Sequence, residues 1–136
     1  MILNNIDLNL HYDKQRDILY VQWPEFGPYT AEHLEEPFAE IMNALSRTKA
    51  KNFILDASNC KVKHSAESFR RIMELMVSGF AQTKLRKIAR IKRPCSSYAS
   101  LFEKDFQEIS IAMGLHIAFR NFADKESALA WLQKES

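Results

Sequence analysis

Glycine is scarce in this chain, with only three residues among 136. The loops that cradle nucleotide phosphates need closely spaced glycines, as in GxGxxG or GxxxxGK[ST], and neither pattern occurs. This scarcity argues against kinases, P-loop enzymes and dinucleotide-dependent oxidoreductases. Cysteine is also rare, because Cys60 and Cys95 are the only two, which is too few for a disulfide scaffold.

Long apolar runs are missing as well. No stretch of about 18 apolar residues occurs, so we predict no membrane span. The first residues lack the basic and apolar regions of a signal peptide, which favours a cytoplasmic protein. A net charge of +2 gives no global reason to expect nucleic acid as a partner. The length predicts one domain over residues 1–136.

Short strand-like runs alternate with helix-like stretches along the whole chain. The predicted order is β-β-α-β-α-β-α-β-α, which is typical of a single α/β domain with a five-stranded mixed sheet. A short polar connection joins the first two strands and predicts an antiparallel hairpin. The strands are expected over residues 6–11, 18–23, 53–57, 85–93 and 117–122.

The predicted helices carry apolar stripes and recognisable end signals. Thr30, Ser65 and Asp124 are suited to cap the first, second and fourth helices. Gly114 is suited to end the third helix. Pro37 lies inside the stripe of the first helix, where it predicts either a kink or the first helical turn.

The second helix has apolar residues beyond one stripe. Its main stripe is predicted to contain Phe69, Ile72, Met73, Met76 and Phe80. Leu75 and Val77 are predicted to lie off that stripe and to form an apolar surface patch. Because such patches usually find a partner and symmetric dimers are the commonest oligomers, we predict a homodimer.

Local sequence adds a resemblance to a known family. The segments Tyr-Thr-Ala-Glu-His-Leu at 29–34 and Asn-Phe-Ile-Leu-Asp-Ala-Ser at 52–58 resemble bacterial anti-sigma-factor antagonists of the STAS, or SpoIIAA-like, fold. The segments at 18–23 and 128–132 resemble bacterial STAS-like proteins of unknown role. This resemblance implies a non-catalytic interaction or regulatory module with a protein partner. The similar CRAL-TRIO fold makes a small-molecule or lipid-binding module a further alternative.

The antagonists carry an Asp-Ser-Ser-Gly segment at the start of the second helix, where a partner kinase phosphorylates one serine. This chain has His64-Ser65-Ala66-Glu67 at the matching place and keeps one of the two serines. We therefore interpret Ser65 as a structural helix cap, with Glu67 adding a favourable charge in the first turn.

The carboxyl edge of a parallel sheet is where α/β proteins usually place ligands. The residues expected there as a partner or ligand site are Asp56, Ser58, His64, Ser65, Cys95 and Ser97. Cys60, His64 and Cys95 lack the spacing of a zinc site, so neither a metal nor a cofactor is predicted.

Cys95 provides an enzymatic alternative. It is expected between a strand and a helix, where a helix dipole lowers the pKa of a thiol, so a thiol-dependent enzyme or redox-sensitive protein is one hypothesis. Thiol phosphatases also need an arginine six residues further on, and Leu101 stands there. Without a complete catalytic set, the sequence favours a protein that is not an enzyme.

Basic residues are concentrated in and around the fourth strand. Strand alternation places Lys84, Arg86, Arg90 and Lys92 on one side of it. Together with Arg120 on the fifth strand, they predict a basic sheet face that the helices leave open; ordinary solvated charges are the alternative. The predicted basic face consists of Arg86, Arg90, Lys92 and Arg120. Nucleic acid is not expected, because stacking aromatics do not interleave with these charges.

Overall fold

Strands and helices follow one another in the predicted order in a computed structural model, which describes residues 9–22, 31–58, 66–92 and 99–134. The α/β class, the mixed five-stranded sheet and the four helices are thereby confirmed. The elements are β1 (Asn9–Asp13), β2 (Ile18–Gln22), α1 (Ala31–Thr48), β3 (Asn52–Asp56), α2 (Ala66–Phe80), β4 (Lys87–Ile91), α3 (Ala99–Ala112), β5 (Ala118–Phe122) and α4 (Lys125–Gln133).

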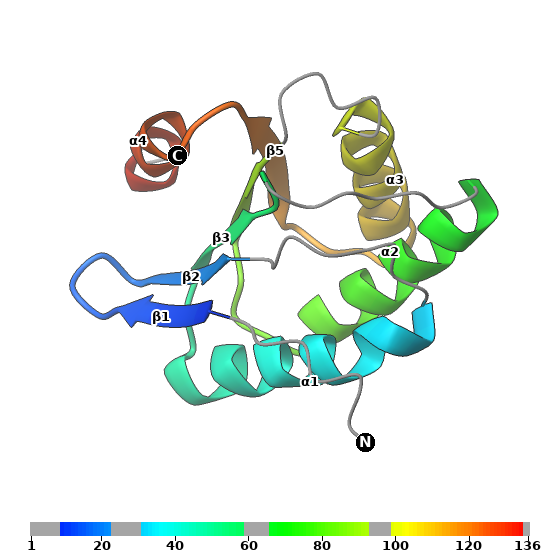
Figure 1. The fold of residues 1–136 in the computed structure, drawn as a ribbon, viewed down its shortest axis with the longest axis horizontal. Coiled ribbons are helices and arrows are strands. Elements are labelled where there is room, and N and C mark those ends of the chain that lie inside the picture. Colours follow the sequence, from blue (N-terminus) through cyan, green and yellow to red (C-terminus); the bar gives the residue numbers. More distant parts are fainter. Residues whose placement is uncertain (1–8, 23–30, 59–65, 93–98, 135–136) are drawn as a thin grey trace.

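The order of strands across the sheet is the same as their order along the chain, β1-β2-β3-β4-β5. The hairpin of β1 and β2 is antiparallel, as predicted, and the other neighbouring pairs are parallel. Each parallel connection therefore runs to the adjacent strand. Right-handed crossovers of this kind place their helices on the same face of the sheet. Figure 1 shows α1, α2 and α3 on one side of the sheet and α4 on the other.

Two apolar cores lie on the two faces of the sheet. The larger core joins Val21, Phe53 and Ile88 of the strands to α1, α2 and α3. The smaller core joins Ile54 and Ala89 to α4. The strands alternate between the cores because successive side chains point to opposite faces. Phe53, Phe80, Phe106 and Phe119 form a chain of ring contacts through the larger core, with centroid distances of 5.9, 6.3 and 4.6 Å.

Val77 is fully buried, so its predicted place on an exposed patch is wrong. It follows Met73 by four residues and precedes Phe80 by three, which puts all three on the face that packs into the larger core. The stripe of α2 is thus wider than predicted. Leu75 is 45% exposed, as predicted.

Two of the predicted helix ends are confirmed. The Asp124 carboxylate accepts a 2.8 Å hydrogen bond from the Ser127 amide and caps α4. Gly114 has a positive φ of 71° and ends α3 in a Schellman motif. In that motif the Leu115 and Gly114 amides donate to the carbonyls of Ser110 and Ile111. Thr30 and Ser65 lie outside the described residues, and their capping roles stay predictions.

Pro37 lies inside α1, since the helix begins at Ala31, and its ring is buried. The strand bounds differ from the predicted ones: β3 lies one residue earlier, at Asn52–Asp56, and β5 is one residue shorter, at Ala118–Phe122. The first is described from Asn9, and residues 6–8 lie outside the described part. The fourth, predicted over residues 85–93, covers Lys87–Ile91.

Within the described ranges, no helix combines the length and apolar character that crossing a membrane requires.

Candidate functional site

A group of polar side chains lies at the carboxyl edge of the sheet, where β3 ends. We call Tyr20, Asp56 and Ser58 the carboxyl-edge cluster. One oxygen of Asp56 accepts a 3.0 Å hydrogen bond from the Tyr20 hydroxyl. The other accepts from both the amide and the hydroxyl of Ser58, at 3.0 and 2.6 Å. The Asp56 carboxylate is therefore occupied by groups of its own fold on both oxygens.

The environment of Tyr20 favours its neutral form. Burial, and then the hydrogen bond to Asp56, raise the pKa of Tyr20 to about 12. The ammonium group of Lys125, at the start of α4, lies 4.5 Å from the centre of the Tyr20 ring. This cation contact fixes the ring against the first turn of α4. At neutral pH, Tyr20 thus acts as a hydrogen-bond donor to Asp56.

The structure places only part of the predicted site. Asp56 and Ser58 are brought together, as the sequence analysis expected for residues at the end of one strand. His64, Ser65, Cys95 and Ser97 lie outside the described residues, so their arrangement stays a prediction. Tyr20 was missed by the sequence analysis. Its signal is the alternation of β2, which places it beside Ile54 and on the same face as Asp56.

The prediction of one open basic face is wrong for Arg90, which is only 4% exposed. Arg90 follows Ile88 by two residues, so it points to the face that α1, α2 and α3 cover. There it donates a 3.2 Å hydrogen bond to the side-chain oxygen of Asn121 on β5. Arg90 therefore lies on the sheet face that three helices cover, whereas the sequence predicted it on a face that the helices leave open.

The other three basic residues are scattered over different parts of the molecule. Arg86 is exposed and precedes β4 at the amino edge of the sheet. Lys92 follows β4 at the carboxyl edge, and its amide donates to the Phe122 carbonyl. Arg120 is exposed on β5, and its guanidinium lies 5.8 Å from the centre of the Phe122 ring on the side of α4. These residues do not form a common surface.

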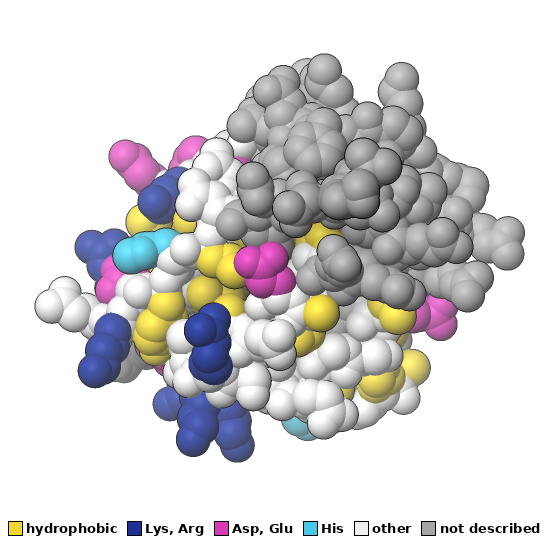
Figure 2. All heavy atoms as spheres, turned by 60° about the horizontal axis from the view of Figure 1, so that its bottom comes forward, with side chains coloured by type: hydrophobic (Ala, Val, Ile, Leu, Met, Phe, Trp, Pro, Cys, Tyr) yellow, Lys and Arg dark blue, Asp and Glu magenta, His cyan; other side chains and the backbone are white. Residues whose placement is uncertain are grey.

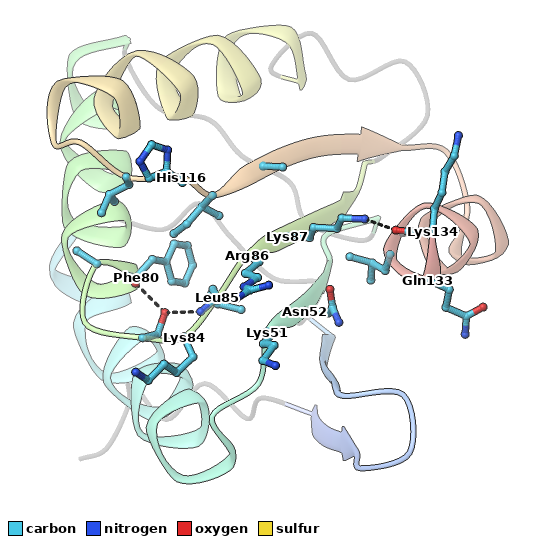
Figure 3. Close-up of a pocket in the computed structure, with 16 residues that line it drawn as sticks. Lys51, Asn52, Phe80, Lys84, Leu85, Arg86, Lys87, His116, Gln133 and Lys134 are labelled. Atoms are coloured by element: carbon cyan, nitrogen blue, oxygen red, sulfur yellow. Dashed lines mark hydrogen bonds between the residues drawn. The ribbon is translucent and has the colours of Figure 1, made fainter. Parts of the chain in front are cut away.

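The sequence analysis did not predict a hollow at the opposite, amino edge of the sheet. This amino-edge hollow has a volume of about 780 Å³. The segments before β3, β4 and β5 and the end of α4 line it, as Figure 3 shows. Its basic side chains come from Lys51, Lys84, Arg86, Lys87, His116 and Lys134, and no carboxylate is among the described residues that line it.

Lys87 plays a separate role within the hollow. Its ammonium group donates hydrogen bonds to the carbonyls of Trp131 and Lys134, at 3.2 and 2.7 Å. It also lies 5.3 Å from the centre of the Trp131 ring. These contacts hold the carbonyl end of α4, where a cation is favourable. Figure 2 shows Lys and Arg side chains at the lower left of the face it presents, beside apolar side chains.

Among the residues with described placement, no three His, Cys, Asp or Glu side chains are grouped so that they could hold a metal ion. Comparison with known proteins gives no relative for the site: no family model, no curated protein and no solved structure matches this chain.

Proposed function

We propose that this chain is a non-catalytic interaction module of the STAS-like type, which docks a protein partner at the carboxyl edge of its sheet. The order of its elements and the resemblance of residues 29–34 and 52–58 to anti-sigma-factor antagonists support the family part of the proposal. The carboxyl edge is the usual ligand edge of a parallel sheet, which supports the place.

One observation carries the proposal: both oxygens of Asp56 are already engaged, by the Tyr20 hydroxyl and by Ser58. A general base needs a carboxylate that can reach a substrate proton. Asp56 instead shapes the backbone that leaves β3, since it binds the Ser58 amide two residues further on. The backbone of residues 56–58, held in this way, offers a partner a fixed surface without taking part in chemistry.

Site-specific photocrosslinking in the native host tests the docking edge. A photoreactive amino acid replaces Gln22, the last residue of β2 at the carboxyl edge. The control carries it at Gln133, which is exposed at the far end of α4. We expect one discrete crosslinked protein from the Gln22 position and none from the Gln133 position. Equal crosslinking from both positions, or none from either, would contradict docking at the carboxyl edge.

The enzymatic alternative depends on Cys95 and is tested separately. We expect the alkylation rate of its thiol to follow an ordinary pKa of about 8.5. The Cys60→Ser variant leaves Cys95 as the only thiol and makes the measurement specific. A strongly lowered thiol pKa, together with a turnover that Cys95→Ala abolishes, would favour a thiol enzyme over the proposed interaction module.

Self-association is the second part of the proposal. Leu75 is a large apolar side chain that is 45% exposed on α2, which supports an interface there. Val77 lies in the core, so Leu75 is the one of the two predicted patch residues on which the proposed dimer contact centres.

A further inference from the structure

The basic side chains of the amino-edge hollow come from three separate loops. Lys51 precedes β3, Lys84 and Arg86 precede β4, and His116 precedes β5. Because β3, β4 and β5 are parallel and adjacent, their starts lie together at one edge. Figure 3 shows Arg86 near the centre of this edge, with Lys51, Lys84 and His116 around it. Residues separated by up to 65 positions thus share one surface because of the topology.

The charges at this edge have no acidic partner among the described residues. The ion pairs found among the described residues involve Arg16 and Arg70, which lie elsewhere. The carboxylate of Asp17 lies beside this edge, and its oxygens accept from the Tyr12 hydroxyl at 2.8 Å and the Lys51 amide at 3.2 Å. It therefore contacts the backbone of Lys51, where one of its oxygens helps to hold the hairpin to β3.

Apolar side chains line the hollow together with these cations. Leu85 is buried, and Leu115 and Ile117 are half-buried on either side of His116 in the sequence. A volume of about 780 Å³ falls within the range of small-molecule sites, roughly 300–1,000 Å³. A lining that is both basic and apolar matches a ligand with an anionic group and a carbon portion.

We propose that the amino-edge hollow binds a small organic phosphate, with the phosphate at Arg86 and Lys51 and the carbon portion over Leu115 and Ile117. An arginine and a lysine offer the charge-assisted hydrogen bonds that phosphate oxygens accept best. This site lies at the edge opposite to the proposed docking edge, so it goes beyond the proposed function and does not depend on it.

Lys51 follows the end of α1 by three residues and Lys84 follows the end of α2 by four, so these two cations come shortly after helix carbonyl ends. A cation near a helix carbonyl end stabilises the helix without any ligand. The two roles differ in what a substitution changes: a helix-end role changes the free energy of unfolding, whereas a ligand role changes the affinity for a phosphate.

Amide chemical shifts of the protein during titration test the proposal. The probes are hexyl phosphate, inorganic phosphate and hexanoate, which separate the organic phosphate from a bare phosphate and from a carboxylate. We expect saturable binding of hexyl phosphate, with the largest shifts in residues 51–52, 83–87 and 115–118. Inorganic phosphate and hexanoate should bind about tenfold more weakly or worse, because inorganic phosphate lacks the carbon portion and hexanoate has a singly charged carboxylate in place of the phosphate.

Variants locate the binding. Lys51→Gln/Arg86→Gln should weaken hexyl phosphate binding about tenfold or more, and Arg120→Gln, an exposed arginine on the side of α4, should change it less than about twofold. The mapping on the unmodified protein remains decisive even where the double variant folds poorly. The proposal is wrong if hexyl phosphate does not saturate, if the shifts follow exposed lysines generally, or if the double variant loses stability while it keeps its affinity.

Discussion

The ammonium group of Lys87, on β4, donates a 2.7 Å hydrogen bond to the backbone carbonyl of Lys134 at the end of α4. It donates a second one to the carbonyl of Trp131. A side chain from the first residue of β4 thus satisfies the carbonyl end of the helix that packs on the sheet. Since α4 has only nine residues, it is too short to be stable alone, and this contact is part of what keeps it in place.

Replacing Lys87 should loosen α4 without unfolding the domain. Lys87→Met keeps the aliphatic stem over Trp131 and removes the two hydrogen bonds. We expect a loss of about 1 kcal/mol in the free energy of unfolding, and faster amide exchange in residues 128–132. Urea unfolding and hydrogen exchange measure both effects. Lys104→Met, at an exposed position of α3, is the matched control and should change neither.

Neighbouring apolar residues of α2 should respond in opposite ways to the same substitution. Val77→Glu places an unpaired charge in the larger core and should cost about 3 kcal/mol or more. Leu75→Glu should change the free energy of unfolding by less than about 0.5 kcal/mol and convert a dimer to a monomer in light scattering. A monomeric mass for the unmodified protein at high concentration would contradict the dimer contact, while leaving the Val77 prediction in place.

Burial of Tyr20, and then its hydrogen bond to Asp56, predict a loss of stability at alkaline pH. The pKa of Tyr20 rises from 10.0 in the unfolded chain to about 12 in the folded one. A raised folded-state pKa gives stability that is fully present below about pH 10 and is lost as the pH rises toward about 12. Tyr20→Phe should be less stable by about 1 kcal/mol at neutral pH, and its deficit should shrink across that interval. Thermal unfolding of both proteins from about pH 8 to about pH 12 measures the difference; a constant deficit would rule out this assignment.

Ser65 remains a predicted cap of α2, which begins at Ala66. Ser65→Ala should destabilise the domain by about 1 kcal/mol, and Ser65→Asp should be nearly neutral, because aspartate caps as well as serine. Asp124 caps α4 in this way, because its carboxylate accepts a hydrogen bond from the Ser127 amide. A phosphorylation switch would behave differently: Ser65→Asp would keep stability but abolish partner binding. Phosphosite mapping of protein from its native host, together with binding by this variant, distinguishes the two roles.

The element order could be predicted because local signals agree with it. An apolar run marks β2, Asp124 is a favoured capping residue directly before α4, and Gly114 supplies the positive φ that ends α3. The position of Arg90 could not be predicted in the same way. Alternation shows that Arg90 and Ile88 share a face, but it does not show which face the crossover helices cover. The polar character of Arg90 suggested solvent, whereas Asn121 on the next strand provides a partner in the interior.

The amino-edge hollow was missed for a related reason. Lys84 and Arg86 were assigned to a strand face, but β4 begins only at Lys87, so they belong to the segment that leads into the strand. Their grouping with Lys51 and His116 arises from the pairing of strands, which spacing along the chain does not reveal. The usable signal is that each of three apolar runs is preceded by a basic residue or histidine. Tyr20 and Asp56 meet for the same reason, across 36 positions of sequence.

The identical order of strands along the chain and across the sheet has a consequence for folding during synthesis. Each new strand pairs with the strand made just before it, so no strand has to wait for a distant segment to be translated. The sheet can therefore extend in one direction from the hairpin, and the loops that must close stay short. β5 and α4 are made after these strands, and α4 covers Ile54 and Ala89 of the inner strands. Until they arrive, one side of the nascent sheet stays apolar and uncovered, and this is the stage at which chaperones would be expected to act on the chain.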